Sequence, residues 1–491
     1  MGNCIMKKTQ ITALLLAALL LVSCGAGQTQ DTGENETADT AAAPETVVEE
    51  EEAEYVFPEL DCGGETFTIL NDYTDWNFTT TIVVEESTGD SLNDTIFNAN
   101  LQVEEEFQVD LSVYEVIISE MVNFYMNSVM AGEDAYKFAI TPCKIMGNPD
   151  AYDAVMELTQ LDALHLDKPW WDQNVAETEQ LVTGEKLYFA ANDINLIAFE
   201  DSMCLFMNED MIRDNGLDPV YDLVREGTWT FDVFRQYAEA GANLNGADSF
   251  AFQVDGEAVY GLTTWTAGVH AFLHGMGNTY VHTGEDGKPA LNMENDRFYT
   301  SVDKLASFHG TEGACIELNK NATEHYEEVF RLGRAMFTCA QLKASTKYRE
   351  VEFTYGIVPM PKYDEEQTEY HNYRTTNVQL TSIPVTNSNA EETAVILDAM
   401  AYLAYRDILP TYWNVNMQHK QLRNEDSIEM LEIISRSRSF NMGAAFTWTS
   451  NLTSKLEPAI LSGNNDVASL IAGFKESIAQ SIRNSMDLMA K

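Results

Sequence analysis

Cysteine is scarce in this chain, with seven residues in 491. Two of the seven stand within the first 24 residues, and the other five are scattered singly at Cys62, Cys143, Cys204, Cys315 and Cys339. An odd number without any C-x-x-C pair argues against a disulfide framework and against a zinc cluster. We therefore predict no metal site, and we expect most of these thiols to be buried as small apolar side chains.

Positive charge is also in short supply. The chain has 29 lysines and arginines against 78 aspartates and glutamates, a formal net charge of −49. Binding to nucleic acid requires a basic face that neutralises phosphates, so nucleic acid is an unsuitable partner for such a chain. Strong acidity favours solubility and does not by itself identify a ligand.

Long hydrophobic runs are absent apart from one near the start. Residues 11–22 are apolar except for Thr12, and Lys7 and Lys8 precede them. About 12 apolar residues are too few to span the roughly 30 Å of bilayer hydrocarbon. A basic head, a short apolar stretch and small residues are typical of a secretory signal, which we assign to residues 1–23. No other segment approaches 18 uninterrupted apolar residues, so we expect the remainder to lie outside the bilayer.

The end of that signal reads LVSCG at residues 21–25 and resembles the lipobox of bacterial lipoprotein signals. The resemblance implies that a diacylglycerol group is attached to the Cys24 thiol and holds the protein on the extracellular (or periplasmic) face of the cell membrane. Residues 28–54 contain ten acidic side chains and no basic or aromatic ones. Such a segment buries too little apolar surface to fold, so we expect residues 24–54 to form a lipidated, disordered acidic tether.

The rest of the chain alternates between strand and helix patterns. Alternating or buried apolar runs predict strands, and a spacing of three to four residues predicts helices. The expected order is strand 66–70, helix 91–107, strand 110–116, helix 121–130, strand 138–141, helices 154–164 and 173–181, strand 186–191, strand 202–208, helix 230–240, helix 267–275, a hairpin turn at 284–287, helices 295–308 and 326–330, strand 355–359, and mainly helices from 390 onward. This alternation predicts an α/β fold with two successive sheets.

Five short segments resemble those of bacterial extracellular solute-binding proteins of the carbohydrate type, relatives of maltose-binding protein. They occur in that family's order, and they read GEKLYFA (184–190), CLFMNEDM (204–211), GTWTFD (227–232), FRLGRAM (330–336) and YGIVPMP (355–361). Each segment is weak evidence alone, but the ordered set behind a lipobox is specific. Relatives often carry a Trp shortly after the fourth segment, whereas residues 337–341 here read FTCAQ, which leaves the identity of the sugar open.

The resemblance implies a two-lobed fold of the type II periplasmic-binding-protein kind, with a ligand cleft between lobes joined by crossover strands. It would place one lobe at residues 55–200 and 337–385, and the other at 201–336 and 386–491. Ligand would bridge the lobes and stabilise their closed arrangement, which the permease of an ABC importer would recognise. Such a protein works as a monomer, uses no cofactor and catalyses no reaction.

Sugars present flat C–H faces and many hydroxyls, so their sites combine aromatic platforms with planar polar groups. The aromatic candidates stand on predicted loops or at predicted helix starts: Trp448, Trp265, and one of the adjacent pair Trp170 and Trp171. The polar candidates are Asp193, beside the predicted crossover, and Arg374. For each of these residues a purely structural role is an open alternative, as a core tryptophan, a turn aspartate or an acid-paired arginine.

Two other functions are left open by the residues. A surface-anchored enzyme acting on glycans is one, although His270 and His274 lack the Glu of H-E-x-x-H and the S-x-x-K match at 301–304 lies within a predicted helix. A binding protein for a peptide or a polyamine is the other, since an acidic body makes a cationic ligand conceivable.

Overall fold

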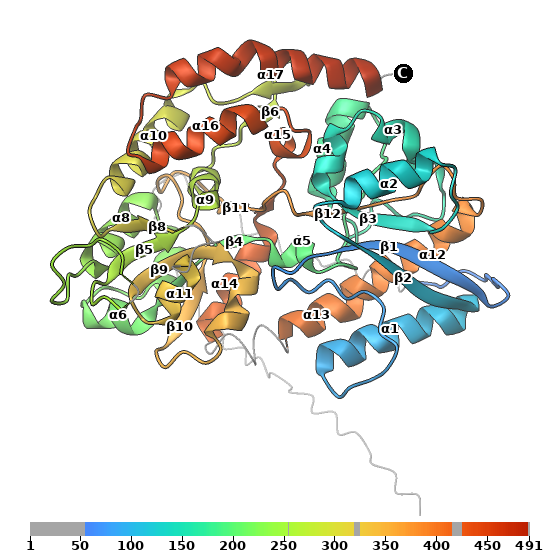
Figure 1. Ribbon diagram of the computed structural model, residues 1–491, viewed down its shortest axis with the longest axis horizontal. Coiled ribbons are helices and arrows are strands. Elements are labelled where there is room, and N and C mark those ends of the chain that lie inside the picture. The colour runs from blue at the N-terminus through green and yellow to red at the C-terminus, as the bar shows by residue number, and fades with distance from the viewer. Residues whose placement is uncertain (1–54, 254, 319–324, 415–424, 490–491) are drawn as a thin grey trace, which may run out of the picture. The chain divides into compact units, whose positions relative to one another are not determined.

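The computed structural model describes residues 55–253, 255–318, 325–414 and 425–489. The predicted secretory signal, Cys24 and the acidic tether lie outside the described residues. Residues 55–491 form one compact unit. Its two main sheets and the helices packed on them are shown in Figure 1. In the described part of the chain, no helix has the length and apolar character needed to span a bilayer.

The first sheet has four strands in the order β12-β3-β1-β2. Strand β1 (Glu65–Tyr73) runs parallel to β2 (Val109–Ile117) and to β3 (Phe138–Pro142), and β12 (Gln379–Ser382) is antiparallel to β3. The crossover helices are α1 (Ser91–Phe107) and α2 (Met121–Met130). The predicted strand–helix–strand–helix–strand order is therefore confirmed for residues 66–141.

Helix α1 was predicted correctly because its N-cap and its apolar periodicity are both local features of the sequence. Its first turn is capped by Asp90, whose side chain accepts hydrogen bonds from the amides of Leu92 and Asn93. Its buried positions include Ile96, Val103 and Phe107, which lie on one helical face and pack on the sheet. Both signals are local, so they can be read directly from the sequence.

The second sheet has five strands in the order β10-β4-β9-β5-β8. The strands are β4 (Met203–Asn208), β5 (Tyr260–Thr264), β8 (Cys315–Glu317), β9 (Ala335–Gln341) and β10 (Tyr355–Val358). Helices α6 (Glu209–Asp214), α7 (Val220–Arg225), α8 (Phe231–Gly241), α9 (Ala267–Gly275), α10 (Asp296–His309) and α11 (Tyr326–Arg331) accompany it. The predicted hairpin is formed by β6 (Val281–Thr283) and β7 (Pro289–Leu291).

The expected lobe boundaries differ from the sheet memberships. Residues 337–385 were expected with the first sheet, but β9 pairs with β4 and β5 and β10 pairs with β4, so both belong to the second. Every residue of β9 is buried, which is what a central strand covered on both faces requires. Helix α12 (Ala390–Leu403) was expected with the second sheet and packs instead against α1. The lobe division therefore remains a proposal with these boundaries shifted.

Two predicted elements are replaced by irregular chain. Residues 186–191 make only one isolated bridge, between Ala190 and Thr381, because the buried carboxylate of Glu179 accepts the amides of Tyr188 and Phe189. Residues 154–164 are not a continuous helix, because Val155 bridges to Pro384 and the Met156 amide donates to Ile383. In both places, backbone groups that would pair within a regular strand or helix form hydrogen bonds with residues from another segment instead.

The chain ends in helices that pack mainly with the second sheet. They are α14 (Glu425–Arg436), α15 (Met442–Ala445), α16 (Ser450–Leu461) and α17 (Ala468–Met489). Helix α14 packs on β10, and α16 packs on α9 and α10. Helix α17 lies along α16 and β7 and also contacts α4 (Gln173–Thr183) (Figure 1).

Candidate functional site

Two neighbouring cavities, which share lining residues, lie between elements attached to the first sheet and elements attached to the second. The larger has a volume of ≈ 600 Å³ and the smaller of ≈ 120 Å³, and Asn174 and Arg438 line both. One wall is α4 with the segments before and after it, and the other is the two-stranded sheet β11 (Asn372–Tyr373) and β13 (Arg438–Ser439) with its flanks. Ligand cavities are commonly 300–1,000 Å³, so the larger one has room for a small oligosaccharide.

The walls are tied to different sheets. Trp170 and Trp171 precede α4 and donate their indole N–H groups to Asp398 of α12, which packs on α1, a crossover helix of the first sheet. The β11–β13 pair packs on α9 and β4 of the second sheet. A solute held between these walls would therefore contact both halves of the compact unit.

The smaller cavity brings together three of the predicted site residues: Trp170, Asp193 and Arg374. Arg374 is only 1% exposed. Its Nη1 donates to Asp172 Oδ2 at 2.8 Å and its Nε donates to the Ser439 carbonyl at 3.2 Å. Its Nη2 is buried and has no hydrogen-bond partner among the residues that the structure describes. Parallel pairing of β11 with β13 holds Arg374 close to Arg438.

The two aspartates of this cavity have different electrostatic surroundings. Burial alone would raise the pKa of Asp172, but the guanidinium groups of Arg374 and Arg438 outweigh burial and hold that pKa below its usual value. Asp193 lies 3.7 Å from Arg438 Nη1, and burial dominates there, so its pKa is raised. Asp172 also caps α4 by accepting the Asn174 amide, which fixes its position.

The two predicted tryptophans share a hydrogen-bond acceptor, but only one of them lines a cavity. Both indoles are buried, and both donate to the same oxygen, Asp398 Oδ1, at 2.9 Å for Trp170 and 3.0 Å for Trp171. Trp170 lines the smaller cavity, whereas Trp171 is not among the residues that line either one. Whether Trp170 contacts solute stays a prediction.

Trp448 and Trp265 lie away from these two cavities. Trp448 is buried, stacks on Phe446 at 4.6 Å between ring centroids, and donates to Ser485 Oγ of α17 at 2.9 Å. Trp265 is half-buried and stacks on Tyr326 at 6.3 Å. The structure therefore does not bring them together with Arg374 and Asp193, and a ligand role for either is untested.

A buried polar layer between the two sheets was missed at the sequence level. The Asp201 carboxylate accepts hydrogen bonds from Gln341, which ends β9, and from Thr375 and Asn377, which precede β12. One carboxylate thus connects both sheets. Burial raises its pKa to about 6. No local pattern marks Asp201, because all three partners are more than 100 residues away.

Three further basic residues near the junction were also missed. Arg436 and Arg438 stand in the stretch SRSRS (435–439), and two arginines so close together are unusual in this acidic chain, which was a usable signal. Lys343 follows β9, and its Nζ donates to the Trp76 carbonyl at 2.7 Å and lies 3.8 Å from the centre of the Phe78 ring. Burial lowers the Lys343 pKa to about 8.

The histidines considered for metal chemistry are buried side chains of α9. His270 contacts the Tyr280 hydroxyl and the Glu457 carboxylate, and burial lowers the pKa of His274 to about 3. Within the described ranges, no group of three or more His, Cys, Asp and Glu side chains is arranged to hold a metal ion. The five described cysteines are free thiols, and Cys143, Cys204 and Cys339 are buried.

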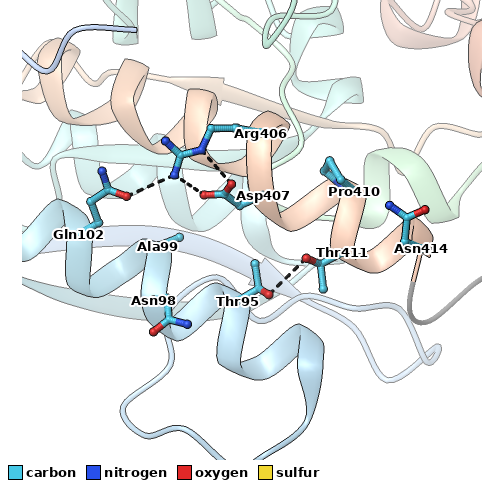
Figure 2. A pocket seen from close by; sticks show the side chains of 9 residues that line it. All are labelled: Thr95, Asn98, Ala99, Gln102, Arg406, Asp407, Pro410, Thr411 and Asn414. Carbon is cyan, nitrogen blue, oxygen red and sulfur yellow. Dashed lines mark hydrogen bonds and ion pairs between the residues drawn. The ribbon is translucent and has the colours of Figure 1, made fainter. Parts of the chain in front are cut away.

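Another cavity, of ≈ 480 Å³, lies between α1 and the chain that continues α12 (Figure 2). That continuation is a π-helical turn, η4 (Ala404–Ile408), followed by α13 (Leu409–Thr411). Figure 2 shows Arg406 turned toward Asp407 and Gln102, and Thr95 of α1 toward Thr411. Both walls belong to elements packed with the first sheet, so occupancy there would not connect the two halves.

No protein-family model matches the chain, and no curated protein matches it. Solved structures do match over most of its length. A cyclic α-maltosyl-1,6-maltose binding protein from Arthrobacter globiformis has a TM-score of 0.56 at 12% identity and covers 86% of this chain and 100% of its own. An ABC substrate-binding protein from Listeria monocytogenes in complex with cycloalternan has a TM-score of 0.52 at 11% identity and covers 87% of this chain and 99% of its own.

A sugar transporter from Rhizobium etli in an open conformation has a TM-score of 0.56 at 13% identity and covers 84% of this chain and 99% of its own. At sequence identities this low, the structural similarity establishes the fold alone. The chain has the two-sheet α/β architecture of periplasmic-binding-protein-like proteins, and its structural neighbours are carbohydrate-type substrate-binding proteins of ABC transporters.

Proposed function

We propose that this chain is the substrate-binding protein of an ABC importer and that it captures a sugar or oligosaccharide between its two halves. The observation that supports the proposal is the pair of neighbouring cavities whose walls are tied to different sheets, in a fold shared with oligosaccharide-binding proteins. The chain itself performs no bond chemistry in this role.

The residues of the two walls have distinct tasks in this proposal. Asp193 accepts hydrogen bonds from sugar hydroxyls, Arg374 donates to ring or hydroxyl oxygens, and the Trp170 ring offers an apolar face. Because solute contacts both walls, it stabilises the arrangement in which they are close and shifts the population toward it. The permease then distinguishes the loaded protein from the empty one by that arrangement.

We further propose that the chain is exported, cut before Cys24 and held to the membrane by lipid on that thiol. Two acyl chains anchor a protein stably, whereas one gives only marginal binding. Residues 25–54 would then let the compact unit reach its permease. Mass spectrometry of the amino-terminal peptide tests this directly: a diacylglyceryl group on Cys24 supports it, and an intact peptide spanning residues 20–30 contradicts it.

Titration calorimetry with residues 55–491, the compact unit, tests the binding function. Maltotriose, cycloalternan, other neutral oligosaccharides, amino acids, peptides and polyamines form the panel. Saturable binding of a sugar, with a gain of about 2.7 kcal/mol in unfolding free energy at 100 times the dissociation constant, supports the proposal. Binding of only a polyamine or peptide contradicts its sugar part, and glycan turnover by the purified protein contradicts the binding-only role.

A further inference from the structure

The two neighbouring cavities are lined by an unusual share of positively charged side chains. Their lining includes Arg374, Arg436 and Arg438 against four carboxylates, those of Asp172, Asp193, Glu177 and Glu369. Over the whole chain, 29 basic residues face 78 acidic ones. With three basic side chains to four acidic ones, the lining of the cavities is much less acidic than the chain as a whole. An anion is therefore repelled less there than elsewhere on the protein.

The arginines keep unused capacity to donate hydrogen bonds. Arg436 is exposed on the larger cavity and makes no ion pair or side-chain hydrogen bond to any residue in the described ranges. Arg374 Nη2 is buried and lacks an acceptor. Arg438 donates through Nε to the Ser435 carbonyl and forms an ion pair with Asp193, with 3.7 Å between Arg438 Nη1 and Asp193 Oδ1, a distance too long for a hydrogen bond.

Three of the four acidic groups do not cancel this capacity, and the fourth, Asp193, offsets part of the charge of Arg438 through their ion pair. Asp172 is engaged by Arg374 and by the Asn174 amide. Glu177 and Glu369 are exposed at the larger cavity, where solvent screens them. A buried guanidinium nitrogen without an acceptor is costly, so an incoming anionic oxygen would supply what the protein does not.

Resting on the proposed function, we infer that the solute is a carboxylated oligosaccharide, whose uronate-type carboxylate is bound by Arg436 and Arg438 with Arg374 behind them. Planar guanidinium groups match a carboxylate in two parallel N–H···O bonds. Tyr370 and Phe440, which also line the larger cavity, offer aromatic faces to the sugar ring that carries it.

The test compares acidic oligosaccharides with neutral forms of the same skeleton. Calorimetry on the full-length protein uses trigalacturonate, a hyaluronan tetrasaccharide and 3′-sialyllactose, each beside its methyl ester, together with maltotriose. We expect at least one acid to bind at least tenfold more tightly than its ester, a preference equal to about 1.4 kcal/mol. This preference should shrink as the salt concentration rises.

Arg436→Gln is the informative variant, because Arg436 supports no other described side chain and its loss should not unfold the protein. It should reduce affinity for the acid at least tenfold and leave the ester unchanged. Arg331→Gln is the matched control, since Arg331 pairs with Glu328 on α11 and is absent from both cavities. It should change neither affinity.

The outcomes separate the inference from the proposed function. Binding of neutral sugars with no preference for any acid, or an acid preference that survives Arg436→Gln, overturns the inference and leaves sugar binding intact. Binding of no sugar of either class overturns the proposed function and the inference with it.

Discussion

Buried and half-buried carboxylates, considered one by one, fall into three groups in this protein. Asp172 is paired with a guanidinium, and Asp201 and Asp398 are surrounded by hydrogen-bond donors. Asp72, at the carboxyl end of β1, is fully buried, and its two oxygens have no hydrogen-bond partner in the described part of the chain. The same side chain is therefore stabilising in one place and costly in another, depending on the donors that reach it.

Asp398→Ala should lower the free energy of unfolding by about 2–4 kcal/mol. The change leaves two buried indole N–H groups, those of Trp170 and Trp171, without their common acceptor. Asp398→Asn is the matched control, because one amide oxygen can still accept both, and it should cost clearly less. Urea denaturation of the two variants measures the difference, and equal losses would contradict the structural role assigned to Asp398.

The pH dependence of stability should reveal Asp72. Burial raises its pKa to about 8, above the value of about 3.9 in an unfolded chain. The native state then holds this proton where the unfolded state has lost it, so stability falls as pH rises from about 4 to about 8. One such group contributes a slope of at most about 1.4 kcal/mol per pH unit.

Asp72→Asn removes that titration and should raise the melting temperature relative to the unchanged protein at pH 8 more than at pH 5. Glu179, with a pKa raised to about 8 by burial, keeps part of the slope in the variant. Asp110→Asn, on the exposed side of neighbouring β2, is the matched control. The same difference in melting temperature between the Asp72 variant and the unchanged protein at pH 5 and at pH 8 would contradict this assignment.

Among the elements, helix α17 contacts parts of the chain that belong with both sheets. It packs along α16 and β7 and also touches α4, whose residues line the proposed site. Ile471, Ile478 and Ile482 are buried along it, at the spacing of one helical face. The last helix thus stabilises both the second sheet's helices and one wall of the cavities.

Ile478→Ala should lower the unfolding free energy by about 2–5 kcal/mol, as deletion of a buried branched side chain does. Leu488→Ala, a comparable truncation at a position that is 45% exposed, is the matched control and should cost much less. Guanidinium denaturation of both variants is the measurement. Similar costs at the two positions would show that α17 is not packed as described.

Elements with local signals could be predicted, and those that depend on distant partners could not. Helix 91–107 and the strands around it were predicted because their caps and periodicity lie within the segment. Strand 186–191 was predicted wrongly, since nothing local shows that Glu179 takes its amides. The same holds for the site. Arg374 and Asp193 were predicted and line the same cavity, but their partners Asp172 and Arg438 were not, because only the folded chain brings those segments near.

At the scale of the whole molecule, charge of one sign works against compactness. A formal net charge of −49 means that most exposed groups repel one another. Added sodium chloride screens this repulsion in both states, but more in the compact one, where charges are closer.

The melting temperature should therefore rise, on the order of a few degrees, between 20 and 200 mM sodium chloride. Differential scanning calorimetry at constant pH measures it, and sodium sulfate at equal ionic strength separates screening from salt-specific effects. A melting temperature that falls with added chloride would mean that attractive ion pairs, such as Arg225 with Glu429, outweigh the repulsion.

The arginine-lined cavity inside an acidic body has a kinetic consequence for an anionic solute. Long-range repulsion from the body slows the encounter, while the short-range guanidinium contacts slow the escape. Added salt should then raise both the association and the dissociation rate constants. The solute would be captured faster and released sooner. Under the proposed function, the protein would load slowly from dilute solution and keep its solute long enough to meet a transporter.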